Sequence, residues 1–346
     1  MIKKCLHAIA IFIVLLPLAA AAEPVRLKLS FFTSDRSIAY QAAVKPFVDA
    51  INSEGKDLLQ IDVFLSGALG GAQRELPQLL LDGRADIAFI VPGQNPERFT
   101  DNAVIELPGL FADVREATLT YTKLISTGSL DGYADFFVIG AYATQPETIH
   151  SRKSINTLAD LRGQKIRVNN PTEAIALAKL GALPVVLAFN ETSPAISSGI
   201  LDGATVPLAQ LFDVGIGRLT GNHYILGTSV APLVLMMNRK VFDRLPDEAK
   251  TLIHKYSGAW AAARFIEVYQ KANEQTFQLI NSDPRRKVVL PSSADQKTAQ
   301  SAFKSITDDW SAKGDHNREL FTLVEAELAI IRKPELGGVR ASAPKE

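Results

Sequence analysis

Short apolar strands alternate with amphipathic helices along this chain, and this alternation constrains its fold more than any other feature. Near the N-terminus, β-like segments cover residues 25–32, 58–65 and 86–91. Helical patterns cover residues 39–51 and 73–81 between them. The order strand, helix, strand, helix, strand predicts a parallel sheet with helices on both faces.

The same alternation returns after Thr144. Its strands are predicted at 148–151, 164–168, 184–187 and 204–207, and its helices at 173–180 and 192–198. Two α/β units of similar build are therefore expected, the first over residues 23–142 and the second over 143–230.

Two further strands are placed to connect these units. Residues 136–143 leave the first unit, and the apolar run 231–237 begins a return segment that extends to residue 245. No proline lies between Pro246 and Ser282, and the spacing of Leu252, Tyr256, Trp260 and Ala263 places them on one helical face. This predicts one continuous helix over 246–282, about 50 Å long, that braces both units. Two more helices are expected at 294–311 and 316–331, followed by a disordered tail over 333–346.

The first 22 residues have the composition of a secretory signal. Lys3 and Lys4 precede an apolar run, and Ala20-Ala21-Ala22 stands just before Glu23, so cleavage is expected after Ala22. No later segment reaches the roughly 20 apolar residues that a membrane-spanning helix needs, so the mature protein is expected to be exported and not membrane-spanning. Cys5 is lost with the signal, which excludes disulfides, thiolate metal sites and thiol nucleophiles.

Charge argues against a nucleic-acid partner. The whole chain has 37 basic and 37 acidic residues, and loss of Lys3 and Lys4 leaves 35 basic residues against 37 acidic ones. Nucleic-acid binding needs clustered lysine and arginine, which this balance does not supply.

One cation stands in an apolar strand in the second unit. The segment 158–168 predicts a short helix, a glycine stop and a strand, and that strand contains Arg167 between Ile166 and Val168. A buried charge is costly unless an anion meets it. Arg167 is therefore predicted either to hold a ligand carboxylate or to pair with an internal one such as Glu147 or Asp160.

Several motifs, taken in order, resemble the periplasmic receptors of tripartite ATP-independent periplasmic (TRAP) transporters, the DctP-type family. They cover nearly the whole mature chain: Leu65-Ser66-Gly67-Ala68-Leu69-Gly70-Gly71, Leu80 to Ala88, Leu107-Pro108-Gly109-Leu110-Phe111, Ser151 to Ile155 with Asp160 to Val168, Leu180 to Val185, Leu201-Asp202-Gly203-Ala204, Met237-Asn238-Arg239 and Leu245-Pro246.

The resemblance implies a class II-like, two-lobed periplasmic binding protein that closes on a small organic acid and delivers it to an ion-gradient-driven membrane permease. It also implies that Arg167 is the partner of the ligand's carboxylate. A guanidinium suits this role because its planar fork makes two parallel charged hydrogen bonds to a carboxylate. No cofactor and no metal are expected.

Departures from the family pattern bear on the ligand. Glu147 stands where some branches have a second arginine, Val206 where they have an asparagine, and Val91 is an apolar residue at a further pocket position. One charged anchor with apolar walls predicts a monocarboxylate with a hydrophobic body, such as an aromatic, branched or keto acid.

Other candidate residues have both a binding and a structural interpretation. Phe189 either stacks on the ligand or belongs to the core, and Phe32 ends the first strand, where clefts form in α/β folds. Asn169 follows Arg167 and either donates to the ligand or ends the strand. The histidines at positions 150, 223, 254 and 316 are far apart in sequence and are expected at the surface or at helix caps.

Two alternative functions use the same architecture. One is a periplasmic dehydratase or similar lyase, in which Glu147 accepts a proton while Arg167 holds the substrate. The sequence offers neither a second acid nor a cofactor motif for such an enzyme. The other is a sensing module that presents its closed form to a membrane kinase.

Overall fold

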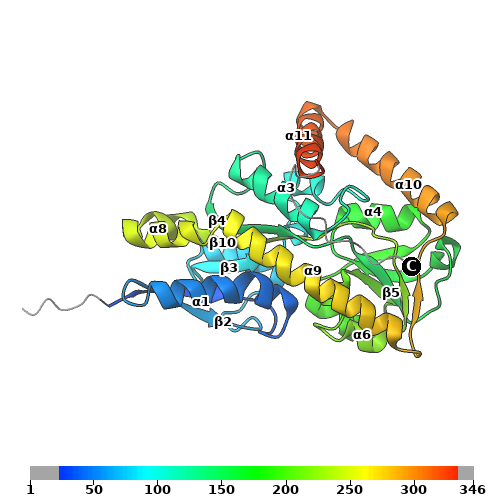
Figure 1. The fold of residues 1–346 in the computed structure, drawn as a ribbon, viewed down its shortest axis with the longest axis horizontal. Helices are drawn as coiled ribbons and strands as arrows, with labels where there is room; N and C mark the ends of the chain where they lie inside the picture. The colour runs from blue at the N-terminus through cyan, green and yellow to red at the C-terminus, as the bar shows by residue number, and fades with distance from the viewer. Residues whose placement is uncertain (1–22, 334–346) are drawn as a thin grey trace, which may run out of the picture.

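The computed structural model describes residues 23–333 and contains two mixed sheets, each covered by helices (Figure 1). The predicted signal at 1–22 lies outside the described residues, as does the predicted tail beyond residue 333. None of the described helices combines the length and the hydrophobicity needed to cross a bilayer.

The first sheet, in lobe I, has five strands in the order β2-β1-β3-β10-β4. The strands are β1 (Val25–Ser30), β2 (Leu59–Phe64), β3 (Ile87–Ile90), β4 (Phe136–Ala143) and β10 (Pro232–Asn238). The first three are parallel, as predicted, but β10 runs antiparallel to both β3 and β4. The sheet is therefore mixed, because the returning strand inserts between β3 and β4.

Burial explains why these strands form the centre of lobe I. All four residues of β3 and all seven of β10 are buried, the pattern of a sheet covered on both faces. Alternate residues serve different cores: Phe89 faces one hydrophobic cluster, and Ala88 and Ile90 face the other. Helices α1 (Lys45–Glu54), α2 (Leu76–Leu81) and α3 (Val114–Ser126) pack on these faces.

The second sheet, in lobe II, has six strands in the order β11-β9-β5-β8-β6-β7. They are β5 (Thr148–Ser151), β6 (Lys165–Val168), β7 (Leu183–Val186), β8 (Gly203–Val206), β9 (Asn222–Tyr224) and β11 (Lys287–Val289). Strand β6 lies parallel to its neighbours β7 and β8. Three helices of this lobe are α4 (Pro171–Lys179), α5 (Thr192–Ser197) and α6 (Ile216–Leu219).

The two crossings between the lobes pair with each other. The Thr144 amide donates to Ala231 O (3.1 Å), and farther along the Glu147 amide donates to Ser229 O (2.7 Å). The Thr228 amide in turn donates to Glu147 O (2.8 Å). We call residues 144–147 with 228–231 the hinge ribbon. Both predicted crossing strands belong to the lobe I sheet, and the chain changes lobe just beyond them.

The predicted continuous helix over 246–282 is wrong. The chain forms α8 (Asp247–Lys255) and α9 (Ala259–Ser282), separated at Gly258, which has φ +57°. The Gly258 amide leaves the helical pattern and donates to Ile139 O in β4 (2.8 Å). Helix α9 alone has 24 residues and is about 36 Å long.

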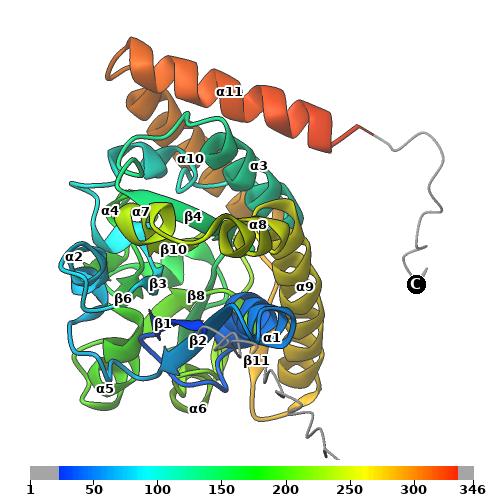
Figure 2. The same cartoon turned by 90° about the vertical axis from the view of Figure 1, so that its left-hand side faces the viewer.

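Helices from the C-terminal part contact both lobes (Figures 1 and 2). In α9, Phe265 joins the lobe I core and Ile280 joins the lobe II core. The predicted helices that follow are confirmed as α10 (Ser293–Ser311) and α11 (Asp315–Ile331). Phe303 of α10 packs in lobe II, whereas Trp310 of α10 and Val324 of α11 pack in lobe I.

Candidate binding site

Arg167 lies near the carboxyl end of β6 and is only 2% exposed. Its neighbours Ile166 and Val168 point into the lobe II core, so the pleat directs Arg167 to the opposite face. Its Nε donates to Leu187 O (2.9 Å) and its Nη1 to Thr205 O (3.2 Å). Its Nη2 donates to Asn169 Oδ1 (3.1 Å).

These acceptors are all uncharged. A guanidinium has five N–H donors, so three hydrogen bonds leave two of them available. Within residues 23–333 no carboxylate lies within ion-pair distance of Arg167. The internal pairing with Glu147 or Asp160 therefore does not form, and Asp160 instead accepts from the Asn156 amide on the surface (2.7 Å).

A buried glutamate that sequence reasoning missed lies close to this cation. Glu173 of α4 is fully buried, and its carboxylate accepts from the hydroxyls of Thr228 (2.6 Å) and Thr205 (2.9 Å). It also accepts from the Asn169 amide (3.2 Å). Burial lowers the pKa of Arg167, while the nearby Glu147 and Glu173 oppose that shift. Glu173 lies in α4, and nothing in the sequence of this helix indicates that its carboxylate is buried near Arg167.

Glu147 is 2% exposed and its Oε2 has no hydrogen-bond partner among the described residues. Burial raises its pKa well above the usual value, and the proximity of Glu173 raises it further. Arg167 opposes this shift only in part. The environment of Glu147 therefore favours its neutral form, while Glu173 accepts three hydrogen bonds.

Two buried side-chain amides, one bonded to Arg167 and one to Phe189, have unpaired N–H donors among the described residues. Asn169 uses its Oδ1 for Arg167, and its Nδ2 has no partner in the described part of the chain. Gln73, in the 3₁₀ turn before α2, accepts from the Phe189 amide (3.3 Å), and its Nε2 is likewise unpaired. Gln94 also reaches across from lobe I and donates to Asn169 O (2.6 Å). Sequence reasoning missed both glutamines.

The two predicted aromatic residues lie where the lobes meet. The Phe189 ring centroid is 6.0 Å from the guanidinium carbon of Arg167. Phe32 is partly buried and packs against core clusters of both lobes. Its ring centroid is 6.2 Å from that of Phe89. Together they provide apolar surface beside a group of N–H donors.

The two predicted valines lie deeper. Val91 (3% exposed) belongs to the lobe I core, and Val206 (1% exposed) belongs to the lobe II core at the end of β8. Val206 contributes its backbone oxygen to an internal hydrogen bond with His150 (3.2 Å). Contact of either valine with a ligand stays a prediction.

The expected surface position of the histidines is wrong for two of them. His150 and His223 are fully buried and meet through their Nδ1 atoms at 2.7 Å. They pair because β5 and β9 are antiparallel neighbours that place these residues opposite each other. His254 is exposed, and His316 lies at the surface against Asp101 (3.0 Å).

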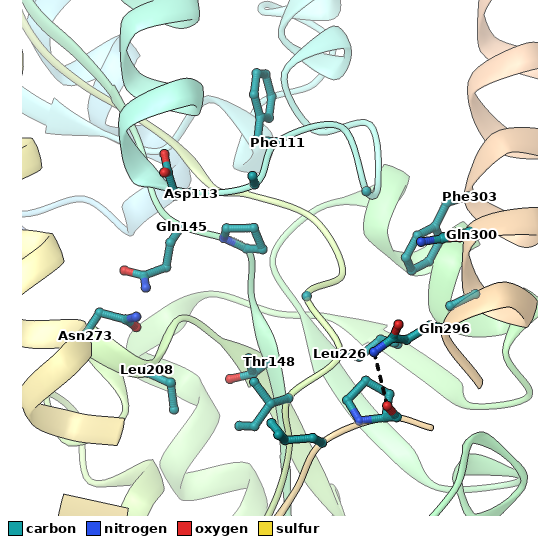
Figure 3. A pocket seen from close by; sticks show the side chains of 18 residues that line it. Phe111, Asp113, Gln145, Thr148, Leu208, Leu226, Asn273, Gln296, Gln300 and Phe303 are labelled. Carbon is teal, nitrogen blue, oxygen red and sulfur yellow. Dashed lines mark hydrogen bonds between the residues drawn. The ribbon is translucent and has the colours of Figure 1, made fainter. Parts of the chain in front are cut away.

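A cavity of about 590 Å³ borders the hinge ribbon and is distinct from the surroundings of Arg167. Figure 3 shows Gln145 of the hinge ribbon, Asn273 of α9, and Gln300 and Phe303 of α10 around this cavity. Neither Arg167 nor any other predicted site residue lines this cavity.

Two α/β lobes, a paired crossing between them and a buried cation at their boundary define a two-lobed solute-binding protein. The sequence profile of bacterial extracellular solute-binding proteins, family 7 (DctP), matches residues 29–313. The chain belongs to this family, and the resemblance to TRAP solute-binding proteins is confirmed. Members of the family are extracytoplasmic transport proteins.

Three relatives illustrate the match. A solute-binding protein of Verminephrobacter eiseniae is 24% identical over 66% of this chain and 69% of its own length. A marine metagenome TRAP protein specific for aromatic acid ligands, solved with metahydroxyphenylacetate, has a TM-score of 0.83 at 23% identity, covering 89% of this chain and all of that one. A Rhodoferax ferrireducens TRAP protein with copurified benzoate has a TM-score of 0.81 at 25% identity, covering 88% and 98%.

Proposed function

We propose that this chain is the periplasmic receptor of a TRAP transporter and binds a monocarboxylate with an aromatic or otherwise apolar body. The N-terminal signal would export it, with cleavage after Ala22, and a membrane permease would receive the ligand. Arg167 takes the carboxylate, and the lobes close around the rest of the molecule.

The observation that carries this proposal is the set of unpaired N–H groups at the lobe boundary. Arg167 retains two donors, and the buried amides of Asn169 and Gln73 retain theirs. A buried donor without an acceptor is costly, and a carboxylate offers about four lone-pair positions to such groups. This excess of donors supports an anionic ligand.

The walls favour an apolar ligand body. Phe189 and Phe32 flank the donors, with Val91 and Val206 behind them in the cores. Glu147 and Glu173 add acidic oxygens to the same region, which disfavours a second carboxylate on the ligand. The aromatic acid ligands of the marine metagenome and Rhodoferax proteins support the same class.

We infer binding rather than turnover. The lyase alternative needs a carboxylate that reacts with a proton of the substrate, but Glu147 has no hydrogen-bond partner at Oε2 among the described residues and no cofactor motif accompanies it in the sequence. A receptor returns its ligand unchanged. Ligand recovered from the protein after long incubation should therefore be chemically intact by mass spectrometry, and any product would favour the enzyme.

The proposal is tested by thermal shift against benzoate, hydroxybenzoates, branched-chain acids and keto acids, with succinate and glucuronate for comparison. A ligand that binds only the folded protein raises the melting temperature by mass action. Monocarboxylates with apolar bodies should give the largest shifts. A response to succinate or glucuronate alone would overturn the assignment of ligand class.

Substitution of Arg167 tests the anchor. We expect Arg167→Ala to fold and to lose roughly 2 to 5 kcal/mol of binding free energy, the usual cost of removing one partner of a buried charged pair. Arg167→Lys should also bind weakly, because an ammonium cannot make the two-pronged contact. Isothermal titration with the best ligand measures both.

A matched control is Arg162→Ala, which removes an exposed arginine before the same strand. It should keep wild-type affinity. If Arg167→Ala binds as tightly as Arg162→Ala, the guanidinium has only a structural role.

A further inference from the structure

A second interlobe cavity lies apart from Arg167. It has a volume of about 550 Å³ and is bordered by the loop Gly93–Glu106 of lobe I, the start of α4 in lobe II, and helices α10 and α11. None of Arg167, Asn169, Gln73 and Phe189 lines it. Its lining is therefore separate from the proposed carboxylate site.

A buried acid faces this cavity. Glu106 is 4% exposed, and its Oε1 has no hydrogen-bond partner in the described part of the chain. Its Oε2 accepts only a long hydrogen bond from the Thr172 hydroxyl (3.4 Å). At Gly93, which also lines the cavity, a Cβ atom would stand 2.5 Å from Oε1. Only glycine fits beside this oxygen, so Gly93 packs directly against Oε1 and leaves Oε2 as the oxygen available to an occupant.

Burial raises the pKa of Glu106 to about 8, and Glu173 contributes to the shift. The acid therefore holds a proton near neutral pH and must release it to pair with a cation. At the rim, Lys313 and His316 are basic, while Asp309 and Asp101 are acidic, and His316 is already paired with Asp101 (3.0 Å). Within residues 23–333, neither of these basic residues forms an ion pair with Glu106.

The walls are aromatic and aliphatic. Trp310 and Phe99 contribute rings, and Ile306 and Ile175 contribute aliphatic surface. A carboxylate together with aromatic faces is the combination that binds organic ammonium groups, through an ion pair and cation–π contacts.

We propose that this cavity binds a small organic ammonium, with its nitrogen on Glu106 and its apolar body against Trp310. The occupant would contact both lobes and α10, and would therefore favour the closed arrangement. By linkage, the amine would raise the affinity of the Arg167 site for the acid. The acid would raise the affinity of this cavity for the amine by the same factor.

The test uses methylammonium, butylammonium and benzylammonium with a Trp260→Phe variant, in which Trp310 is the remaining tryptophan. We expect a saturable change in Trp310 fluorescence with at least one amine, and weaker binding of the neutral analogue benzyl alcohol. Glu106→Gln should lower amine affinity by more than about tenfold. The exposed Glu248→Gln is the matched control and should leave it unchanged.

A second variant keeps the test decisive if Glu106→Gln does not fold. Ile175 is 49% exposed at the cavity, so Ile175→Lys should fold and repel the ammonium by its charge. Arg167→Ala should retain amine binding, which separates this site from the carboxylate site. The proposal is overturned if no amine gives a saturable signal, or if folded Glu106→Gln or Ile175→Lys binds amines as the wild type does.

Discussion

Arg167 satisfies three of its five N–H donors with acceptors from lobe II. Leu187 and Thr205 contribute backbone oxygens, and Asn169 contributes its side-chain oxygen. The orientation of the cation is therefore set before lobe I takes part. A rigid, pre-oriented fork loses little entropy when a carboxylate arrives.

The buried histidines form an ordered proton chain. Arg286 can only donate, so its contact with His223 Nε2 (3.2 Å) makes that nitrogen an acceptor. The proton of His223 is then on Nδ1 and is donated to His150 Nδ1. This leaves the His150 proton on Nε2, facing Val206 O. Both rings are neutral in this arrangement, and protonation of either would set two N–H groups against each other.

Acidification should therefore destabilise the protein through this pair. Burial lowers the pKa of His223 to about 4 from 6.5, and that of His150 also falls. The unfolded chain then binds more protons than the folded one between pH 4 and 6.5. The resulting stability is complete above pH 6.5 and is lost as the pH falls towards 4. His223 contributes roughly 3 kcal/mol to this change.

Urea unfolding between pH 4 and 7 measures the effect. His223→Gln should flatten the slope of unfolding free energy against pH relative to the wild type. His254→Gln, which changes an exposed histidine, should keep the wild-type slope. Equal slopes for His223→Gln and the wild type would contradict the proton chain.

At the residue scale, the sequence could indicate only residues that a local pattern marks. A lone cation in an apolar strand marked Arg167, and the strand end marked Asn169. Gln73 and Glu173 carry no such mark, because their contacts with Phe189 and Thr228 join residues 116 and 55 positions apart. Periodicity describes near neighbours and cannot show such pairs.

At the scale of elements, the break before α9 is the main departure from expectation. The apolar spacing continues through residues 252–263, but spacing records which face is buried and not whether the backbone is continuous. The local signal was Ser257-Gly258, because glycine within a helical pattern often marks an end. The Gly258 amide donates to Ile139 O, and Ile139 lies more than a hundred residues earlier in the chain. A local pattern cannot show such a distant contact.

Gly258 should therefore resist substitution for conformational reasons. Its φ of +57° with ψ of −119° is open to glycine but strained for other residues, although a Cβ would meet no atom within 4 Å. We expect Gly258→Ala to cost about 1 to 3 kcal/mol of unfolding free energy.

Gly314 provides the matched control, because it also precedes a helix and has open space around it. Its φ is 171°, which any residue adopts, so Gly314→Ala should be close to neutral. Chemical denaturation of both variants measures the difference. Equal losses would show that the backbone at Gly258 is not strained.

Topology was predictable only in part. The alternating pattern correctly predicted most strands and helices, including β1, β6 and α10. Strands β9 and β11 have three residues each, too few for a periodic signal. The insertion of β10 between β3 and β4 depends on tertiary packing, which no short segment encodes.

At the scale of the whole molecule, lobe I contributes contacts that complete the site. Gln94 bonds to Asn169, and Gln73 bonds to Phe189. On another part of the boundary, Asp213 of lobe II accepts from the Ile38 amide of lobe I (3.0 Å). These contacts should form as the lobes come together, after the acid has met Arg167.

This order predicts separate effects on the two rate constants. Gln73→Ala should leave the association rate of the acid nearly unchanged and raise its dissociation rate by about tenfold, because lobe I holds the complex closed. Arg74→Ala, an exposed neighbour, is the control. Stopped-flow kinetics measures both rate constants. A slower association with unchanged dissociation would contradict the proposal that the acid meets Arg167 before the lobes close.

Helices α9 and α10 are anchored in both lobes, and this limits how the molecule moves. Phe265 and Ile280 hold α9 at its two ends, and Phe303 and Trp310 hold α10. Separation of the lobes must bend these two helices or pull one of these buried side chains out of its core. Opening is therefore restricted to a small rotation with elastic resistance, and the molecule returns to its resting shape when that resistance is released.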